Sequence, residues 1–270
     1  MLISKPSLIA VFDMNNIYVV YSDEFEKNDY ENSPAAMKGR MSGIIELVKT
    51  QTDYCIVQPP NIDDAEILNV HFPEYVEKIK SNNTLFSIAK LSAASAIKAS
   101  DLAMDGVPAF SCARPPGHHA SRGDSWGYCY FCNIAIALKR LRKQGRINSA
   151  FVLDFDAHTG DGTIDCLSDW KEVKILNPMA DDAQKYLKTI DEFTETLSNI
   201  DIVAVSAGFD SYLLDVGKKL STFDFYLIGR KMKELAKKLS KGRRFAALEG
   251  GYYLPDLPKN VLAFCDGFKN

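Results

Sequence analysis

The sequence predicts an α/β fold, with a mostly parallel central sheet and helices on both of its faces. Segments with strand character alternate with segments of helical periodicity along the chain. Several strand segments, among them residues 150–153 and 202–206, carry no charge, which is typical of parallel strands that are buried on both faces. No repeat, linker or low-complexity stretch interrupts this alternation, so residues 1–270 are expected to form a single domain.

The composition is that of an ordinary globular protein and excludes several classes of partner. The net charge of −3 gives no reason to expect a nucleic acid or an anionic membrane surface. Residues 1–11 form a short apolar run, which is expected to be a strand rather than a signal peptide, and no segment is long and apolar enough to span a bilayer. The six cysteines have no framework spacing, as expected of reduced thiols in a cytoplasmic protein.

In the first half of the chain, proline and glycine mark the boundaries of the expected elements. Pro34 begins a helix, Pro59 follows the second strand, and Gly106 ends a long Ala- and Ser-rich helix. Residues 22–33 and the glycine- and proline-broken residues 114–128 are expected to be loops. The expected strands are 7–12, 54–58 and 108–113, and the expected helices are 35–50, 63–70, 73–80, 84–104 and 133–143.

The second half continues as strands and helices in regular alternation. Short apolar runs predict the strands, and apolar residues at helical spacing predict the helices between them. The expected strands are 150–153, 173–176, 202–206 and 245–248, and the expected helices are 161–167, 182–197, 223–239 and 255–268.

Four of the loops that follow expected strands carry polar side chains. In open parallel sheets, ligands bind just beyond the carboxyl ends of the strands. Three of the four histidines of the chain fall in these loops, and neither solubility nor packing explains that clustering. The loops are residues 113–120, 154–158, 207–210 and 249–252.

The loop after residues 150–153 has the composition of a cation site. Asp156 and His158 are two residues apart, so on a strand they point the same way and can bind one ion. Asp154 lies on the same face, and this many carboxylates at the end of a buried strand are costly unless a cation pairs with them. The alternative is a polar strand-to-helix turn in which Asp161 caps the following helix.

Five motifs in these loops resemble those of the zinc-dependent histone deacetylases and acetylpolyamine amidohydrolases, and they occur in the order of that family. The resemblance runs from about Val70 to Tyr252, and Pro34 with residues 39–41 is similar to the first active-site loop of the family. It implies an arginase-like α/β fold and an enzyme that removes an acetyl group from an N-acetylated amine by metal-activated water. The motifs are 114–119 (Arg-Pro-Pro-Gly-His-His), 127–129 (Gly-Tyr-Cys), 154–158 (Asp-Phe-Asp-Ala-His), 206–210 (Ser-Ala-Gly-Phe-Asp) and 248–252 (Leu-Glu-Gly-Gly-Tyr).

The resemblance also implies a role for each matching residue. The implied metal ligands are Asp156, His158 and Asp210, with Zn²⁺ expected from the family and Fe²⁺, Co²⁺ or Mn²⁺ compatible with the same ligands. The implied catalytic residues are His118 and His119, held by Asp154 and Asp161, and Tyr252 as the donor to the oxyanion. The implied substrate channel is lined by Gly127, Tyr128 and Phe209. The family also binds potassium close to its metal, so K⁺ is expected as a structural ion near residues 154–158.

Two departures from the family pattern bear on function. Thr159 stands where the family commonly has a second histidine, but that position is not a ligand, so catalysis should survive. Only the 23 residues 178–200 separate the strands 173–176 and 202–206, where relatives usually carry a longer glycine-rich loop that walls the channel. The site is therefore expected either to be an open cleft or to be closed by a neighbouring chain of a homo-oligomer.

Several alternatives stay open on the sequence alone. The substrate could be acetyl-lysine, an acetylpolyamine or another small acetylamide. A catalytically silent protein that binds acetylated ligands or acts as a scaffold would have the same fold, although the intact ligands, histidine pair and tyrosine argue against it. Arginase-like chemistry with two manganese ions would need further Asp and His ligands at the strand ends, and the Pro-Gly-His-His setting matches the deacetylases better.

Overall fold

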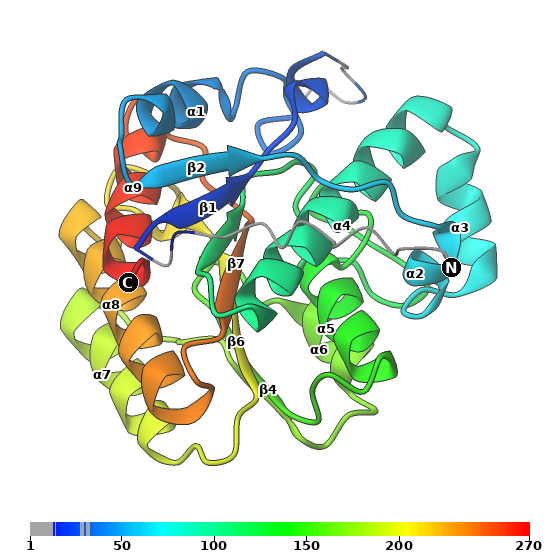
Figure 1. The fold of residues 1–270 in the computed structure, drawn as a ribbon. Helices are drawn as coiled ribbons and strands as arrows, with labels where there is room; N and C mark the ends of the chain where they lie inside the picture. The colour runs from blue at the N-terminus through cyan, green and yellow to red at the C-terminus, as the bar shows by residue number, and fades with distance from the viewer. Residues whose placement is uncertain (1–12, 14, 28–29, 31–32) are drawn as a thin grey trace, which may run out of the picture.

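The computed structural model describes residues 13, 15–27, 30 and 33–270. Within these residues, seven parallel strands form one twisted sheet in the order β2-β1-β3-β7-β6-β4-β5 (Figure 1). The predicted α/β fold with a parallel central sheet is confirmed. The strands are β1 (Ile17–Val20), β2 (Tyr54–Val57), β3 (Ala109–Ser111), β4 (Ala150–Asp154), β5 (Val173–Leu176), β6 (Ile202–Ala207) and β7 (Arg244–Leu248).

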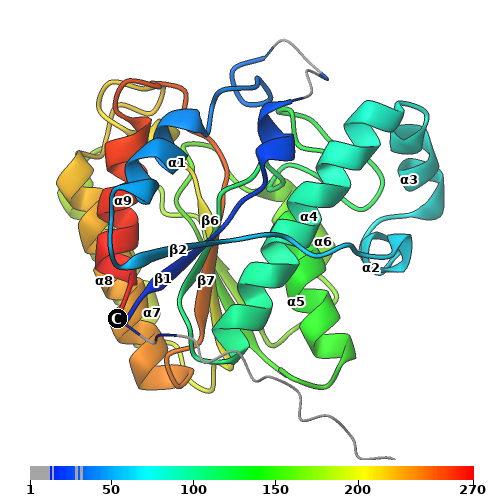
Figure 2. The ribbon, with the colours of Figure 1, turned by 45° about the horizontal axis from the view of Figure 1, so that its top comes forward.

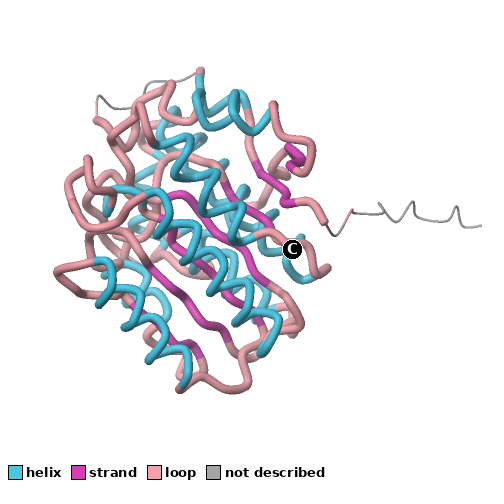
Figure 3. Tube along the Cα trace, turned by 90° about the vertical axis from the view of Figure 1, so that its left-hand side faces the viewer, coloured by secondary structure: helices cyan, strands magenta, loops and turns pink. Residues whose placement is uncertain are grey.

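Helices cover both faces of the sheet, as expected of parallel strands. Helices α1, α7, α8 and α9 lie on one side, and α2 to α6 lie on the other (Figures 1 and 2). Figure 3 shows helices of the first group running across the front of the strands. The helices of the described residues are α1 (Ser42–Lys49), α2 (Asp64–Leu68), α3 (Pro73–Lys80), α4 (Asn83–Met104), α5 (Asn133–Lys143), α6 (Asp161–Leu167), α7 (Ala183–Glu195), α8 (Thr222–Leu239) and α9 (Leu257–Phe268).

Each face of the sheet has its own hydrophobic core, and the strands feed both cores alternately. In β4, Phe151 and Leu153 belong to the core under α1, α7, α8 and α9, whereas Val152 belongs to the core under α2 to α6. All three side chains are fully buried. Because both faces of these strands are buried, their sequences do not alternate between apolar and polar residues.

Two expectations for the N-terminal region need comment. The expected strand at 7–12 lies outside the described residues. The strand that occupies the sheet between β2 and β3 is β1, Ile17–Val20, which the sequence analysis placed in no element. The expected helix at 35–50 begins only at Ser42, because residues 33–41 form turns in which Gly39 has a φ of +82°, a backbone conformation that interrupts a helix.

The strand order places the four polar loops next to one another. They follow β3, β7, β6 and β4, which are consecutive neighbours in the sheet, and all strands run in the same direction. The carboxyl ends of these strands therefore bring His118, Glu249, Asp210 and Asp156 to one edge of the sheet. None of the helices in the described part of the chain is long and apolar enough to cross a membrane.

Candidate active site

Three side chains with metal-binding chemistry meet at the ends of β4 and β6. Asp156 and His158 follow β4, and Asp210 lies in the short 3-10 helix η2 (Phe209–Ser211) after β6. Their ligand atoms all lie within 4.8 Å of one another. His158 Nδ1 is 3.0 Å from Asp156 Oδ1 and 3.1 Å from Asp210 Oδ2. The fold thus brings together the three residues that the sequence predicted as metal ligands.

The surroundings of the two carboxylates fit a bound cation. The backbone N–H of Gly250 donates to Asp156 Oδ2 at 2.8 Å, and that of Ala157 donates to Asp210 Oδ1 at 2.9 Å. Asp210 Oδ2 is buried and lies 3.1 Å from His158 Nδ1, and a buried carboxylate oxygen is costly unless a positively charged group pairs with it. Two carboxylates and one imidazole suit Zn²⁺ and other divalent transition metals, and they leave positions open for water and substrate.

The charges at this point favour a cation between the carboxylates. Burial and the charge of Asp156 raise the pKa of Asp210 to about 6. Hydrogen bonds to Asp156 and Asp210 raise the pKa of His158 to about 10. Both shifts mean that two carboxylates in a buried site stabilise a positive charge placed between them, whether an imidazolium or a metal ion carries it.

His118 and His119 each use Nδ1 to contact a carboxylate. His118 Nδ1 lies 3.1 Å from Asp154 Oδ2, and His119 Nδ1 lies 2.6 Å from Asp161 Oδ1. A carboxylate accepts a hydrogen bond from Nδ1–H, so each pair favours the tautomer that keeps the proton on Nδ1 and leaves Nε2 free to take up another. Gly160 is required beside the first pair, because a Cβ there would lie 2.1 Å from Asp154 Oδ2.

The pKa values of the two histidines are shifted in opposite directions. Burial lowers the pKa of His118, but the charges of Asp156 and Asp154 outweigh burial and raise it well above its ordinary value. Burial, together with the charge of His118, lowers the pKa of His119 to about 4. The two rings lie side by side, with centroids 3.9 Å apart, and their surroundings favour the protonated form of His118 and the neutral form of His119. A proton acceptor and a proton donor are thus available at the same place.

The backbone around Tyr252 is held by Asp215 and by a buried arginine. Its N–H donates to Asp215 Oδ2 at 2.6 Å, and the N–H of Tyr253 donates to the same oxygen at 2.8 Å. Arg40, which is 2% exposed, donates to the carbonyls of Glu249 and Gly251 on the segment before Tyr252. Burial and the charges of Asp156 and Asp210 raise the pKa of Tyr252 above its ordinary value, so its hydroxyl keeps its proton and can donate it in a hydrogen bond.

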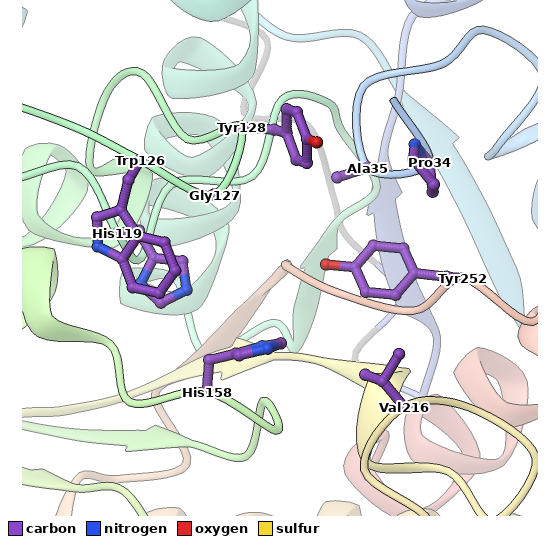
Figure 4. A pocket seen from close by; sticks show the side chains of 9 residues that line it. All are labelled: Pro34, Ala35, His119, Trp126, Gly127, Tyr128, His158, Val216 and Tyr252. Carbon is purple, nitrogen blue, oxygen red and sulfur yellow. The ribbon is translucent and has the colours of Figure 1, made fainter. Parts of the chain in front are cut away.

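A pocket of about 640 Å³ joins these groups at the surface. Figure 4 shows the Tyr252 hydroxyl pointing across it toward the side that carries His119 and His158. Gly127 and Tyr128, which the resemblance to the deacetylases assigns to a substrate channel, line this pocket. The lining residues are Pro34, Ala35, His119, Trp126, Gly127, Tyr128, His158, Val216 and Tyr252.

Phe209 does not line this pocket, and its assignment to the substrate channel is wrong. Its side chain is 1% exposed and points into the core. The ring contacts those of Phe155, Phe225 and Phe264, with centroid distances of 5.4, 5.0 and 6.1 Å. Asp210 points toward His158, whereas the side chain that precedes it is directed away and packs inward.

The structure adds residues that the sequence analysis did not single out. Trp126 and Val216 line the pocket, and Asp215 anchors the backbone of Tyr252. Trp126 could have been noticed, since it is one of two tryptophans in the chain and stands in a polar loop. Asp215 and Val216 follow Asp210 by a few residues, and no local pattern distinguishes them.

Glu249 is a buried carboxylate beside the histidine loop. Its Oε2 accepts hydrogen bonds from the N–H groups of Gly117 at 2.7 Å and His118 at 3.1 Å. Its Oε1 is buried and has no hydrogen-bond partner among the described residues. Burial raises the pKa of Glu249 to about 7. The side chain thus holds the His118 segment in place, and burial brings its pKa close to neutral pH.

Replacement of Glu249 by glutamine is expected to change how stability depends on pH. Between the ordinary pKa of 4.5 and the folded value of about 7, the folded protein keeps a proton that the unfolded chain releases, so wild-type stability falls as the pH rises through this window. Glutamine carries no such proton. The free energy of unfolding should be measured with urea from pH 4.5 to 8. Over this range, the value for Glu249→Gln should rise relative to that of the wild type by at most roughly 2–3 kcal/mol.

The exposed Glu195 on α7 offers a matched control. For Glu195→Gln, the difference in unfolding free energy from the wild type should stay constant across the same pH range. A constant difference for Glu249→Gln as well would show that Glu249 is charged in the folded protein and would contradict the prediction.

Comparison with known proteins agrees with this arrangement. A family model for the histone deacetylase domain matches residues 34–189. Histone deacetylase 14, chloroplastic, of Arabidopsis thaliana is 29% identical over 202 residues, which cover 62% of this chain and 48% of the plant protein. A probable deacetylase of Archaeoglobus fulgidus is 26% identical over 310 aligned positions, which cover 93% of this chain and 86% of that protein.

Polyamine deacetylase HDAC10 of Mus musculus is 26% identical over 261 residues, which cover 73% of this chain and 39% of the mouse protein. This chain thus spans about half or less of the length of the plant and mouse relatives, whereas it matches most of the archaeal one. Since the domain model covers more than half of the 270 residues, the chain belongs to the histone deacetylase domain family.

Proposed function

We propose that this chain is a metal-dependent amidohydrolase, formed as a single catalytic domain, that removes the acetyl group from an N-acetylated amine. The observation that carries the proposal is the convergence on one pocket of three elements. These are the Asp156–His158–Asp210 group, the two histidine–carboxylate pairs, and a tyrosine hydroxyl. Each element suits one task in amide hydrolysis: holding the metal ion, transferring protons, and stabilising the oxyanion.

Asp156, His158 and Asp210 would hold the metal ion. When bound, such an ion supplies Lewis-acid chemistry by lowering the pKa of water and polarising the acetyl carbonyl. The neutral His119 is suited to take a proton from the attacking water at Nε2, while Asp161 keeps Nδ1 protonated. The charged His118 is suited to protonate the departing amine, with Asp154 holding its ring. Tyr252 would donate a hydrogen bond to the oxyanion.

We propose zinc as the resident metal and potassium as a second, structural ion near residues 154–158. The donor set supports zinc but also suits Fe²⁺, Co²⁺ and Mn²⁺. Metal analysis of the purified protein, followed by removal with a chelator and reloading with each ion, identifies the metal that restores turnover. A comparison of KCl with NaCl in thermal denaturation tests for the potassium ion.

We infer that the site is an open cleft that favours small acetylated amines. Residues 177–182 connect β5 to α7 directly, and none of the described residues 178–200 lines the pocket. With no wall on this side, the aliphatic chain of a long substrate stays largely exposed to water when it binds, so binding buries little of its surface. Among the relatives, the mouse protein is named a polyamine deacetylase, so acetylpolyamines belong among the substrates to be compared.

The substrate prediction is tested with acetyl-lysine peptides, acetylpolyamines and small acetylamides. We expect turnover of the small acetylamides with a high KM, and no strong preference for acetyl-lysine in histone-like peptides. A strong preference for such peptides would contradict the open cleft. Activity that falls on dilution would instead show that a second chain of a homo-oligomer completes the wall. Tight binding of acetylamides to metal-loaded protein without turnover would favour a silent binding protein.

A further inference from the structure

A tight turn at residues 126–129 is built against the catalytic histidines. The N–H of Cys129 donates to the carbonyl of Trp126 at 3.1 Å, and the two central residues, Gly127 and Tyr128, have φ values of +59° and +61°. A Cβ at Gly127 would lie 2.6 Å from His119 Cδ2, so the turn can approach the imidazole only with glycine there. Tyr128 adopts a left-handed conformation that costs a non-glycine residue roughly 1–2 kcal/mol, and such strain concentrates at functional sites.

This turn places Trp126 on both members of the His119–Asp161 pair. The indole stacks on the His119 ring with centroids 3.7 Å apart and an interplanar angle of 30° (Figure 4). Its Nε1–H donates to Asp161 Oδ2 at 2.8 Å, while Asp161 Oδ1 lies 2.6 Å from His119 Nδ1. One side chain therefore contacts the ring that moves protons and the carboxylate that orients that ring.

Asp161 needs such support, because its side chain is 50% exposed. A half-exposed carboxylate can rotate and exchange its partners with water, whereas the matching Asp154 is fully buried. With Trp126 on Oδ2 and His119 on Oδ1, each oxygen has an N–H partner and the rotation is restrained. The other face of His119 lies against His118 at 3.9 Å, so the imidazole is held between two rings.

We propose that Trp126 is a positioning residue for the His119–Asp161 pair, in addition to forming part of the pocket wall. The indole is 54% exposed, so burial in the core does not determine its place. Its stacking and its hydrogen bond fix the tilt of His119 and the orientation of Asp161, so that Nε2 faces the metal-binding residues. The inference deepens the proposed function and rests on it as far as turnover is concerned.

Two substitutions separate the stacking from the hydrogen bond. Trp126→Phe keeps a flat ring over His119 but removes the N–H to Asp161, and Trp126→Leu removes both. Because small displacements of a catalytic group are costly, we expect kcat to fall roughly tenfold or more in Trp126→Leu, and less in Trp126→Phe. Because Trp126 also lines the pocket, KM should rise as well in Trp126→Leu, and the fall in kcat is the measure of the lost positioning. Thermal denaturation checks that both variants are folded.

Tyr128→Leu is the matched control, since Tyr128 belongs to the same turn and the same wall. Removal of its ring should raise KM rather than lower kcat. If Trp126→Leu also changed KM alone, Trp126 would be only a wall residue and the proposal would be overturned. An unchanged kcat in Trp126→Leu would overturn it equally.

A second measurement does not depend on activity. The chain has four histidines, and the ring C–H signals of His119 in the NMR spectrum of labelled protein should be shifted upfield by the stacked indole. They should move downfield in Trp126→Leu and partly so in Trp126→Phe. Unchanged His119 signals in both variants would overturn the proposal. Wild-type protein that hydrolysed no acetylamide would refute the proposed function, and the NMR result would still decide whether Trp126 holds His119.

Discussion

Replacement of Asp156 or Asp210 by alanine is expected to abolish both metal binding and turnover. Each substitution removes one of three ligand side chains whose atoms lie within 4.8 Å of one another, and the two that remain are too few for a catalytic site of this kind. Metal content per chain, measured by mass spectrometry of the metal, and hydrolysis of an acetylamide should both fall to background. Full metal occupancy in both variants would contradict the ligand assignment.

The variants can be distinguished from misfolded protein by their stability without metal. In the metal-free protein, the two buried carboxylates repel each other, since the charge of Asp156 contributes to the raised pKa of Asp210. Asp210→Ala removes this repulsion, so its metal-free form should unfold at a temperature close to that of the metal-free wild type. Asp156→Ala also removes a carboxylate that stabilises the charge of His118 and His158, so its metal-free form should unfold cooperatively but at a lower temperature. The exposed Asp181 provides a control, because Asp181→Ala should leave metal content and turnover unchanged.

The sequence was sufficient for most of the fold because its strands are buried on both faces. The runs at 150–153 and 202–205 are apolar and are buried on both sides of the sheet, so they are not mistaken for surface segments. The short strand β1, Ile17–Val20, escaped notice because four residues between polar neighbours carry too little pattern. Its place in the sheet depends on pairing with β2 and β3, which no local pattern reports.

Site residues whose role depends on their chemical type could be predicted from the sequence. Residues whose role depends on the direction of their side chain could not. Asp156, His158 and Asp210 are recognisable as ligand types at strand ends, and the structure brings them together. Phe209 stands beside Asp210 in sequence but points the other way, into a cluster of aromatic rings. Trp126 reaches His119 only because of two consecutive positive φ values, and no sequence pattern predicted that turn.

Substitution of Tyr252 by phenylalanine is expected to lower kcat by roughly a hundredfold or more and to leave metal content intact. The change removes a single hydroxyl group from the pocket, opposite His158 (Figure 4). The ring should stay in place, because the N–H of Tyr252 is bound by Asp215 and the preceding carbonyls by Arg40. The loss would therefore come from the missing hydrogen bond to the oxyanion, which forms only in the transition state, so KM should change far less than kcat.

The neighbouring Tyr253 is a matched control for this prediction. It has the same side chain and receives the same backbone anchor from Asp215, but it does not line the pocket that holds His119 and His158. Tyr253→Phe should therefore leave kcat close to that of the wild type. If Tyr252→Phe also kept the wild-type kcat, turnover would not depend on this hydroxyl, and Tyr252 would be a wall residue. Equal losses in the two variants would point instead to displacement of the segment that Asp215 holds.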